Sequence, residues 1–308
     1  MISIIIPCFN AEKTIDRALT SLINQTNKSF EVIAVNDGST DRTHEILQSY
    51  KTKLNLKIIN QDNQGLGISR NNAAKVATRK YLCFLDSDDY WLPNKINKIL
   101  VFVKRTNDSI QLLCHNEYML VDNKIVGAYK YGTMKNFHEL LVLGNCLSPS
   151  AVMINKKLFI NTGMFTVDLK LHGVEDYDLW LKISINNIKI HYMNEILGYY
   201  CLHEANMSND PNFYKKSILL QNKYLLLVKS SNIILHNKML SQLKIINYLE
   251  KIIRDYKTIY NPIILIKLFI KLIENINEKI IYRWLLIKFE KKLFSIFHKL
   301  KNSYRSVR

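Results

Sequence analysis

The 308-residue sequence has no run of about 18 uncharged apolar residues, the length that a membrane-spanning helix requires. Its most apolar stretch, Pro262 to Ile273, is interrupted by Lys267 and Lys271. The first residues lack the basic start and the long apolar segment of a secretory signal peptide, and they have the pattern of a strand. These absences predict a cytoplasmic protein without a transmembrane span.

Cysteine and glycine motifs are sparse as well. The five cysteines are scattered without a CxxC pair or a metal-finger spacing, so we expect them to be reduced and mostly buried. The segment Gly65 to Arg70 lacks the third glycine of a dinucleotide-binding fingerprint, which argues against a Rossmann enzyme. A sugar nucleotidyltransferase would carry a glycine-rich phosphate loop after its first strand, where this chain has Pro7-Cys8-Phe9-Asn10.

Acidic residues are scarce in one part of the chain. The formal net charge of +17 comes from 43 Lys and Arg against 26 Asp and Glu, and residues 211–308 hold 20 of the basic and 5 of the acidic residues. The first 210 residues are therefore nearly neutral. This split predicts a body, residues 1–210, that carries the chemistry and a basic region that serves location or a partner.

The body alternates strand and helix signals with short polar connections, which is typical of an α/β fold with a mostly parallel sheet. Helices are expected between successive strands, at about residues 94–105, from residue 175, and over most of residues 213–308. Asp37 and Asp86 each lie just past a strand, at the sheet edge where α/β proteins bind ligands. The predicted strands are Ile2–Ile6, Phe30–Val35, Leu56–Ile59, Tyr81–Leu85, 112–120 and 150–154.

The segment Asp86-Ser87-Asp88-Asp89 places three carboxylates within four residues. They repel one another unless a cation or solvent relieves them. Such oxygen ligands suit Mg²⁺ or Mn²⁺, which take one or two carboxylates and let substrate phosphates complete the shell. An Asp-rich turn that caps the helix beginning near Pro93 is the structural alternative. The position of this segment at a strand end favours a metal site over a helix cap.

Four further groups have both a functional and a structural interpretation. Asp37 can accept a hydrogen bond from the N3–H of uracil, or can belong to an ordinary turn before a helix. Arg70 is a charge partner for a phosphate or carboxylate, or a surface arginine. The pair Glu175-Asp176 begins a helix, where the dipole favours carboxylates, and either can be a general base. His203 can bind metal or phosphate, although a lone histidine is more often structural.

Five segments together resemble the family 2 glycosyltransferases, in the right order and spacing. The resemblance covers residues 1 to about 210. It implies the GT-A fold, with a nucleotide-sugar half at about 1–110 and an acceptor half at about 111–210, followed by a helical C-terminal extension. The segments are Ser3–Asn10, Val35–Asp41, Gly67–Asn71, Phe84–Asp89 and Glu175–Trp180.

The resemblance implies a metal-dependent, inverting transfer from a nucleotide-sugar, with UDP favoured, to a hydroxyl of a glycan or lipid-linked oligosaccharide in surface-polysaccharide synthesis. The product would be β-linked. By carry-over, Asp176 is the catalytic base, with Glu175 as the alternative, and Asp88 ligates Mn²⁺ or Mg²⁺. His203 is a further metal ligand, although the arginine that usually precedes it in the family is absent. The expected donor-nucleotide contacts are Pro7, Phe9, Asn10, Asp37, Arg70, Asp86 and Ser87.

The basic region, residues 211–308, fits a protein that rests on the anionic inner face of the plasma membrane, where Tyr282 and Trp284 suit the headgroup region. Packing of these helices on the body explains the lysines equally well. Nucleic acid is not expected as a partner, because no recognised binding module is present. A non-catalytic carbohydrate-binding protein is the remaining alternative, and the intact Asp37, Asp88 and Asp176 argue against it.

Overall fold

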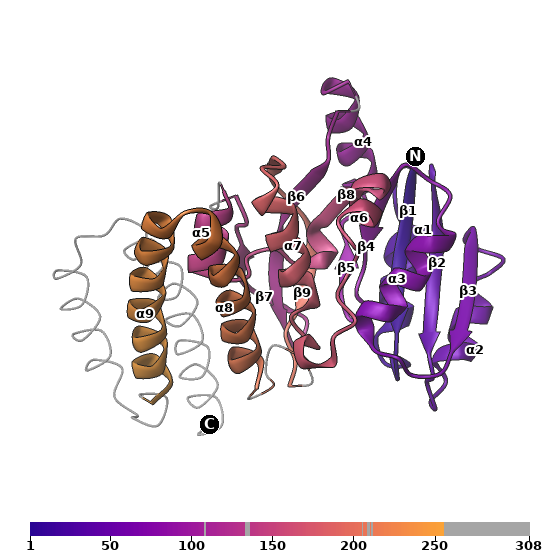
Figure 1. The fold of residues 1–308 in the computed structure, drawn as a ribbon. Coiled ribbons are helices and arrows are strands. Elements are labelled where there is room, and N and C mark those ends of the chain that lie inside the picture. The colour runs from indigo at the N-terminus through magenta and orange to yellow at the C-terminus, as the bar shows by residue number, and fades with distance from the viewer. Residues whose placement is uncertain (108, 133–135, 205, 208–209, 211, 256–308) are drawn as a thin grey trace. The chain divides into compact units, whose positions relative to one another are not determined.

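The computed structural model describes residues 1–255 apart from 108, 133–135, 205, 208–209 and 211 (Figure 1). The predictions for Tyr282 and Trp284 lie outside the described residues. The chain divides into two compact units. The first consists of residues 1–137 and 146–220, and the second of His138–Asn145 and the chain from Gln221 onward.

One mixed sheet forms the centre of the first unit, in the order β3-β2-β1-β4-β8-β6-β9-β5, with β7 paired to β6. The first four strands are mutually parallel, and β8 runs antiparallel to β4 and β6. This confirms the predicted α/β fold with a mostly parallel sheet. The strands are β1 (Ile2–Cys8), β2 (Phe30–Asp37), β3 (Leu56–Gln61), β4 (Tyr81–Phe84), β5 (Tyr90–Trp91), β6 (Leu112–Val121), β7 (Lys124–Tyr129), β8 (Val152–Asn155) and β9 (Ile190–Cys201).

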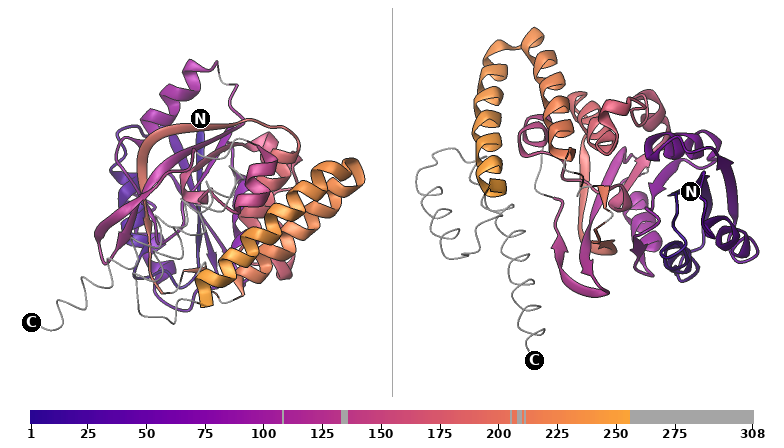
Figure 2. Two further views of the ribbon diagram at one scale, coloured as in Figure 1. Left: turned by 90° about the vertical axis from the view of Figure 1, so that its left-hand side faces the viewer. Right: turned by 90° about the horizontal axis from the view of Figure 1, so that it is seen from below.

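Helices flank this sheet and form the described part of the second unit. In the second unit, Gln221 Nε2 donates to Leu141 O at 3.0 Å, and the part of α8 that begins at Gln221 runs beside α9 (Figure 2). No helix in the described part of the chain has the length and apolar character needed to cross a membrane. The helices are α1 (Ile15–Ile23), α2 (Thr43–Ser49), α3 (Leu66–Val76), α4 (Lys95–Arg105), α5 (Phe137–Leu143), α6 (Lys156–Asn161), α7 (Glu175–Ile185), α8 (Phe213–Ser231) and α9 (Ile233–Asp255).

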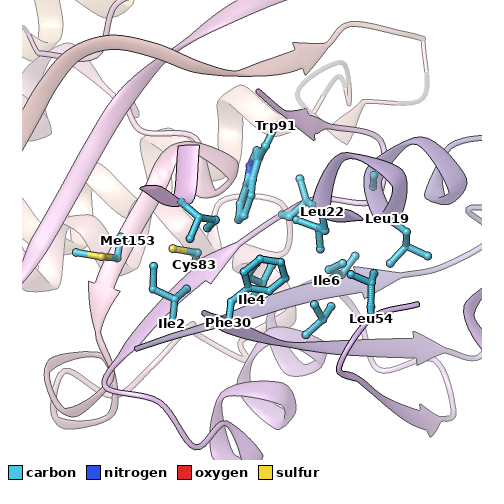
Figure 3. Packing of buried hydrophobic residues seen from close by; sticks show 14 of the residues in the cluster. Ile2, Ile4, Ile6, Leu19, Leu22, Phe30, Leu54, Cys83, Trp91 and Met153 are labelled. Carbon is cyan, nitrogen blue, oxygen red and sulfur yellow. The ribbon is translucent and has the colours of Figure 1, made fainter. Parts of the chain in front are cut away.

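The core of the first unit follows from the two periodicities of its sequence. Alternate residues of β1 point to opposite faces of the sheet, so Ile2, Ile4 and Ile6 share one face. Leu19 and Leu22 belong to the apolar face of α1, on which apolar residues recur every three or four positions. They pack against that face of the sheet (Figure 3). The core therefore fixes the start of the chain, and with it the sheet edge where β1, β2 and β4 end.

Three strands, β5, β7 and β9, were not predicted, and β5 and β9 matter for the site. The twelve residues of β9 pair in parallel with β6 and in antiparallel fashion with the short β5. Its sequence lacks a clean alternation because the register with β6 shifts near Asn116, so no period of two extends along the strand. The pairing brings Cys201, the last residue of β9, to the acidic turn that follows β4.

Candidate active site

The parallel strands β1 and β2 end side by side, and their following loops are joined by hydrogen bonds. The backbone N–H of Asn10 donates to Ser39 Oγ at 3.0 Å, and that of Thr40 donates to Asn10 Oδ1 at 2.9 Å. Pro7 is buried within β1, whereas the Phe9 ring is 51% exposed at the edge. The predicted donor residues Pro7, Phe9 and Asn10 therefore line one rim of the sheet.

Asp37, the last residue of β2, is buried and accepts hydrogen bonds on both carboxylate oxygens. Oδ1 accepts from Gln61 Nε2 at 2.7 Å and from the Gln64 N–H at 2.9 Å, and Oδ2 accepts from the Gly65 N–H at 2.8 Å. These bonds hold the loop that leads into α3. A carboxylate offers about four acceptor sites, so capacity for a further donor such as a uracil N–H is left.

Gly38 follows Asp37 and makes this loop contact possible. Its φ of +74° lies in the left-handed region, and a Cβ atom there would lie 2.8 Å from the backbone nitrogen of Asn63. Glycine is therefore required at this position both by conformation and by the close approach of the neighbouring backbone.

Arg70 on α3 is buried beneath the edge and connects the predicted donor and catalytic residues. It forms an ion pair with Asp86, with 1% of the Arg70 side chain and 23% of the Asp86 side chain exposed. Burial by itself would lower the pKa of Arg70, but Asp86, Glu175 and Asp176 together raise it above its ordinary value. Arg70 is thus the charge partner of carboxylates and not a surface arginine.

Because this pair is buried, we expect Arg70→Ala to lower the free energy of unfolding by about 3–5 kcal/mol, since it leaves Asp86 without its cation. Arg42→Ala is the matched control. It removes a pair with Glu12 at 3.5 Å in which the arginine side chain is 76% exposed, and such pairs contribute about 1 kcal/mol or less. Urea denaturation of both variants measures the difference, and equal losses would contradict the structural role of Arg70.

Asp88 and His203, the two predicted metal ligands, face each other. His203 Nε2 lies 2.7 Å from Asp88 Oδ2, and this hydrogen bond raises the pKa of the imidazole above its ordinary value. Asp88 is half-buried and His203 exposed, so a ligand can reach both. Ser87 is half-buried in the same turn.

This donor set of one carboxylate and one imidazole fits a divalent cation that takes its remaining ligands from substrate phosphates and water. Among the described residues, no group of three or more His, Cys, Asp or Glu side chains could hold a metal on its own.

Asp89, the third carboxylate of the turn, has a structural task that the sequence did not reveal. Its Oδ1 accepts from the Cys201 N–H at 2.9 Å, and its own N–H donates to Asp86 O at 3.0 Å. The side chain is buried, which raises its pKa well above the usual range. Asp89 thereby closes the acidic turn and ties it to the end of β9.

The two candidate bases stand in the first turn of α7 but differ in access. Glu175 is buried; Oε2 accepts from the Gly173 N–H, and Oε1 is buried without a hydrogen-bond partner. Asp176 is half-buried, and its Oδ1 accepts from the Tyr177 N–H at 2.7 Å. Access favours Asp176 as the group that an acceptor hydroxyl can meet.

A further group of ionisable residues near the acidic turn was missed, because its members come from separate segments of the chain and form no motif. Burial raises the pKa of Glu117 on β6 to about 7 and lowers that of Lys95 on α4 to about 7. Tyr131 Oη donates to Glu117 Oε2 at 2.9 Å, and Lys95 Nζ donates to Ser150 O at 2.6 Å. Asp86 lies close enough to act on Glu117 electrostatically.

The chain is similar to known glycosyltransferases. Residues 3–163 match the family model described as Glycosyl transferase family 2. The chain is 31% identical over 234 residues to the Escherichia coli UDP-Glc:alpha-D-GlcNAc-diphosphoundecaprenol beta-1,3-glucosyltransferase WfaP, covering 76% of this chain and 85% of that protein. It is 30% identical over 212 residues to WfgD, an Escherichia coli enzyme of the same description, covering 68% and 80%.

Among solved structures, the crystal structure of S. aureus TarS 1–349 in complex with UDP-GlcNAc matches with a TM-score of 0.66 and 21% identity. The match covers 100% of this chain and 92% of that one. At this identity the likeness establishes the fold, and it confirms the predicted GT-A architecture. The family model and the E. coli relatives go further, and they show that the chain belongs to glycosyltransferase family 2.

Proposed function

We propose that the chain transfers a sugar from a UDP-sugar to a hydroxyl of a lipid-linked glycan in surface-polysaccharide synthesis, with inversion to a β-linkage. One observation carries the proposal. Arg70 is buried and ion-paired with Asp86 on the expected donor side, and Glu175 and Asp176 lie close enough to act on it electrostatically, so the expected donor and catalytic carboxylates surround one cation. The relatives WfaP and WfgD, described as UDP-Glc-dependent enzymes with a diphosphoundecaprenol acceptor, support the substrate classes.

The donor nucleotide lies across the carboxyl ends of β1, β2 and β4 in this proposal. Asp37 accepts from the base with its remaining acceptor capacity, and the exposed Phe9 ring offers an apolar face beside it. Asp86 contacts the ribose, in a position fixed by its ion pair with Arg70. Pro7, Asn10 and Ser87 are the remaining expected contacts of the donor nucleotide.

Asp88 and His203 would hold Mn²⁺ or Mg²⁺ against the diphosphate. When bound, the cation neutralises the charge that develops on the departing nucleoside diphosphate. Without a cation, the Asp88 carboxylate would repel the diphosphate, so these two residues make donor binding depend on the metal.

Asp176 acts as the general base. The acceptor oxygen attacks the anomeric carbon on the face opposite UDP, the bond from that carbon to the diphosphate oxygen breaks, and the hydroxyl proton passes to the Asp176 carboxylate. One displacement inverts the configuration, so an α-linked donor gives a β-linked product without a covalent enzyme intermediate. Glu175 stays beside Arg70 as the buried partner that orients the start of α7.

A transfer assay tests this proposal. Purified protein is incubated with a panel of UDP-, GDP- and TDP-sugars and with diphosphoprenol-linked N-acetylglucosamine, and the product is examined by NMR. We expect transfer from a UDP-sugar and a coupling constant that shows a β-linkage. An α-linked product from an α-linked donor would contradict an inverting transfer with Asp176 as the base. Nucleotide binding without transfer to any acceptor would favour the non-catalytic alternative.

We propose further that the protein works on the anionic inner face of the plasma membrane through residues 211–308, whose net charge of +15 supports the idea. The full-length chain should sediment with vesicles that contain phosphatidylglycerol and not with phosphatidylcholine vesicles. High salt should release it, because the attraction is electrostatic. No sedimentation with either vesicle would favour packing of this region on the protein itself, and equal sedimentation with both would contradict an electrostatic attraction.

A further inference from the structure

The proposed metal ligands Asp88 and His203 come from segments 115 positions apart in the sequence. Asp88 belongs to the turn after β4, and His203 lies two residues beyond the end of β9. The two side chains meet because these segments are held together. What holds them therefore decides whether the pair exists.

Arg17 on α1 contacts both segments with its guanidinium group. Its Nη2 donates to the backbone oxygen of Asp88 at 2.9 Å and lies 3.1 Å from Cys201 Sγ, and Nη1 donates to Asn123 Oδ1 at 3.0 Å in the β6–β7 turn. A guanidinium offers five donors in a rigid plane, so it can bind several acceptors at once. A lysine ammonium at this position could not reproduce that fork.

Arg17 is itself held firmly. Its helix packs on β1 through Leu19 and Leu22 (Figure 3), and the guanidinium carbon lies 4.7 Å from the centre of the Tyr90 ring. Tyr90 in turn stacks on Tyr199 of β9 with ring centres 4.4 Å apart. The position of the guanidinium is therefore set by the core and by both segments that it bridges.

The hydrogen bonds around Arg17 meet at Cys201, the last residue of β9. The Cys201 N–H donates to Asp89 Oδ1, and the Cys201 carbonyl accepts from Asn206 Nδ2 at 3.1 Å. Asn206 Oδ1 also accepts from the His203 N–H, so the turn that carries the imidazole is anchored to the same residue. A shift of Cys201 would move His203 away from Asp88.

We infer that Arg17 is a positioning residue that fixes Asp88 and His203 in the geometry needed to bind a divalent cation with the donor diphosphate. The inference rests on the proposed function, because it concerns the same site. Groups that orient metal ligands from behind commonly change metal affinity by about 10- to 100-fold when they are removed. Arg17→Ala should therefore weaken Mn²⁺-dependent binding of UDP to that extent, while UDP binding in EDTA stays near that of the wild type.

Calorimetric titration of UDP into full-length protein, with Mn²⁺ and with EDTA, measures both affinities. Arg105→Ala is the matched control, since Arg105 is exposed at the end of α4. Arg17→Lys keeps the charge and most of the aliphatic side chain, so it replaces the alanine variant if that variant fails to fold. We expect its Mn²⁺-dependent affinity for UDP to fall about 10-fold. Added guanidinium chloride at millimolar concentration should restore part of the Mn²⁺-dependent affinity of Arg17→Ala and none in Arg105→Ala.

Three results would overturn the inference. If both Arg17 variants keep the Mn²⁺-dependent affinity of Arg105→Ala, or lose affinity equally in Mn²⁺ and EDTA, Arg17 does not position the metal ligands, and the proposed function stands. If the wild type itself binds UDP equally with Mn²⁺ and EDTA, the metal site of the proposed function fails together with this inference.

Discussion

Asp176→Asn is expected to slow sugar transfer by about 10²- to 10⁴-fold while leaving the affinity for UDP unchanged. The amide has the shape of the carboxylate but cannot take the proton of the acceptor hydroxyl. It can still accept from the Tyr177 N–H through its oxygen, so the start of α7 should keep its structure. Single-turnover transfer and calorimetry with UDP and Mn²⁺ measure the two quantities separately.

Glu175→Gln is the matched comparison, because the two carboxylates are neighbours in sequence. Glu175 is buried in the field of Arg70, so we expect its amide variant to lose stability to urea more than Asp176→Asn does. If Glu175→Gln loses turnover with UDP binding intact and Asp176→Asn remains active, the base is Glu175 and the choice of Asp176 is wrong.

Asp88→Ala is expected to abolish the contribution of Mn²⁺ to UDP binding. The variant removes the carboxylate that faces His203 at 2.7 Å, and an imidazole by itself is a weak site for a hard cation. UDP affinity in EDTA should not fall, because the same change removes a negative charge from the diphosphate site. Titrations of UDP with Mn²⁺ and with EDTA give the two affinities.

The histidine partner and an exposed carboxylate provide the comparisons for this variant. His203→Ala should weaken the Mn²⁺-dependent affinity less than Asp88→Ala, and the double variant should resemble Asp88→Ala, since the two residues act on one cation. Glu45→Ala, on the exposed side of α2, should bind as the wild type does. Equal Mn²⁺-dependent affinity for Asp88→Ala and Glu45→Ala would rule out the metal assignment.

The sequence predicted the donor side of the fold well, because β1, β2 and β4 are short apolar runs bounded by polar turns. Their parallel order then placed Asp37 and Asp86 at one edge by a general rule of α/β sheets. The structure follows that rule, with Ile4 of β1 paired to both Val32 and Cys83. Prediction succeeded where a local pattern determines the local structure.

The second half of the site depends on contacts between distant segments, and no local pattern reports them. Polar and apolar residues do not alternate regularly along β9, because its pairing register with β6 shifts. Neither the strand nor its pairing with β5 could therefore be predicted from its sequence. The contacts of Asp89 and Arg17 with the end of β9 depend on that pairing, so the structural roles of these two residues were not predicted either. The pairing of Asp88 with His203 was anticipated through the family resemblance, because spacing in the sequence could not place them together.

Titration of UDP, GDP, CDP and TDP into the wild-type protein, with and without Mn²⁺, tests most directly whether this sheet edge is a nucleotide-sugar site. We predict that UDP binds most tightly and that Mn²⁺ strengthens its binding. If no nucleoside diphosphate binds in either condition, the edge formed by Asp37, Asp86 and Asp88 is not a donor site, and the proposed transfer reaction is wrong.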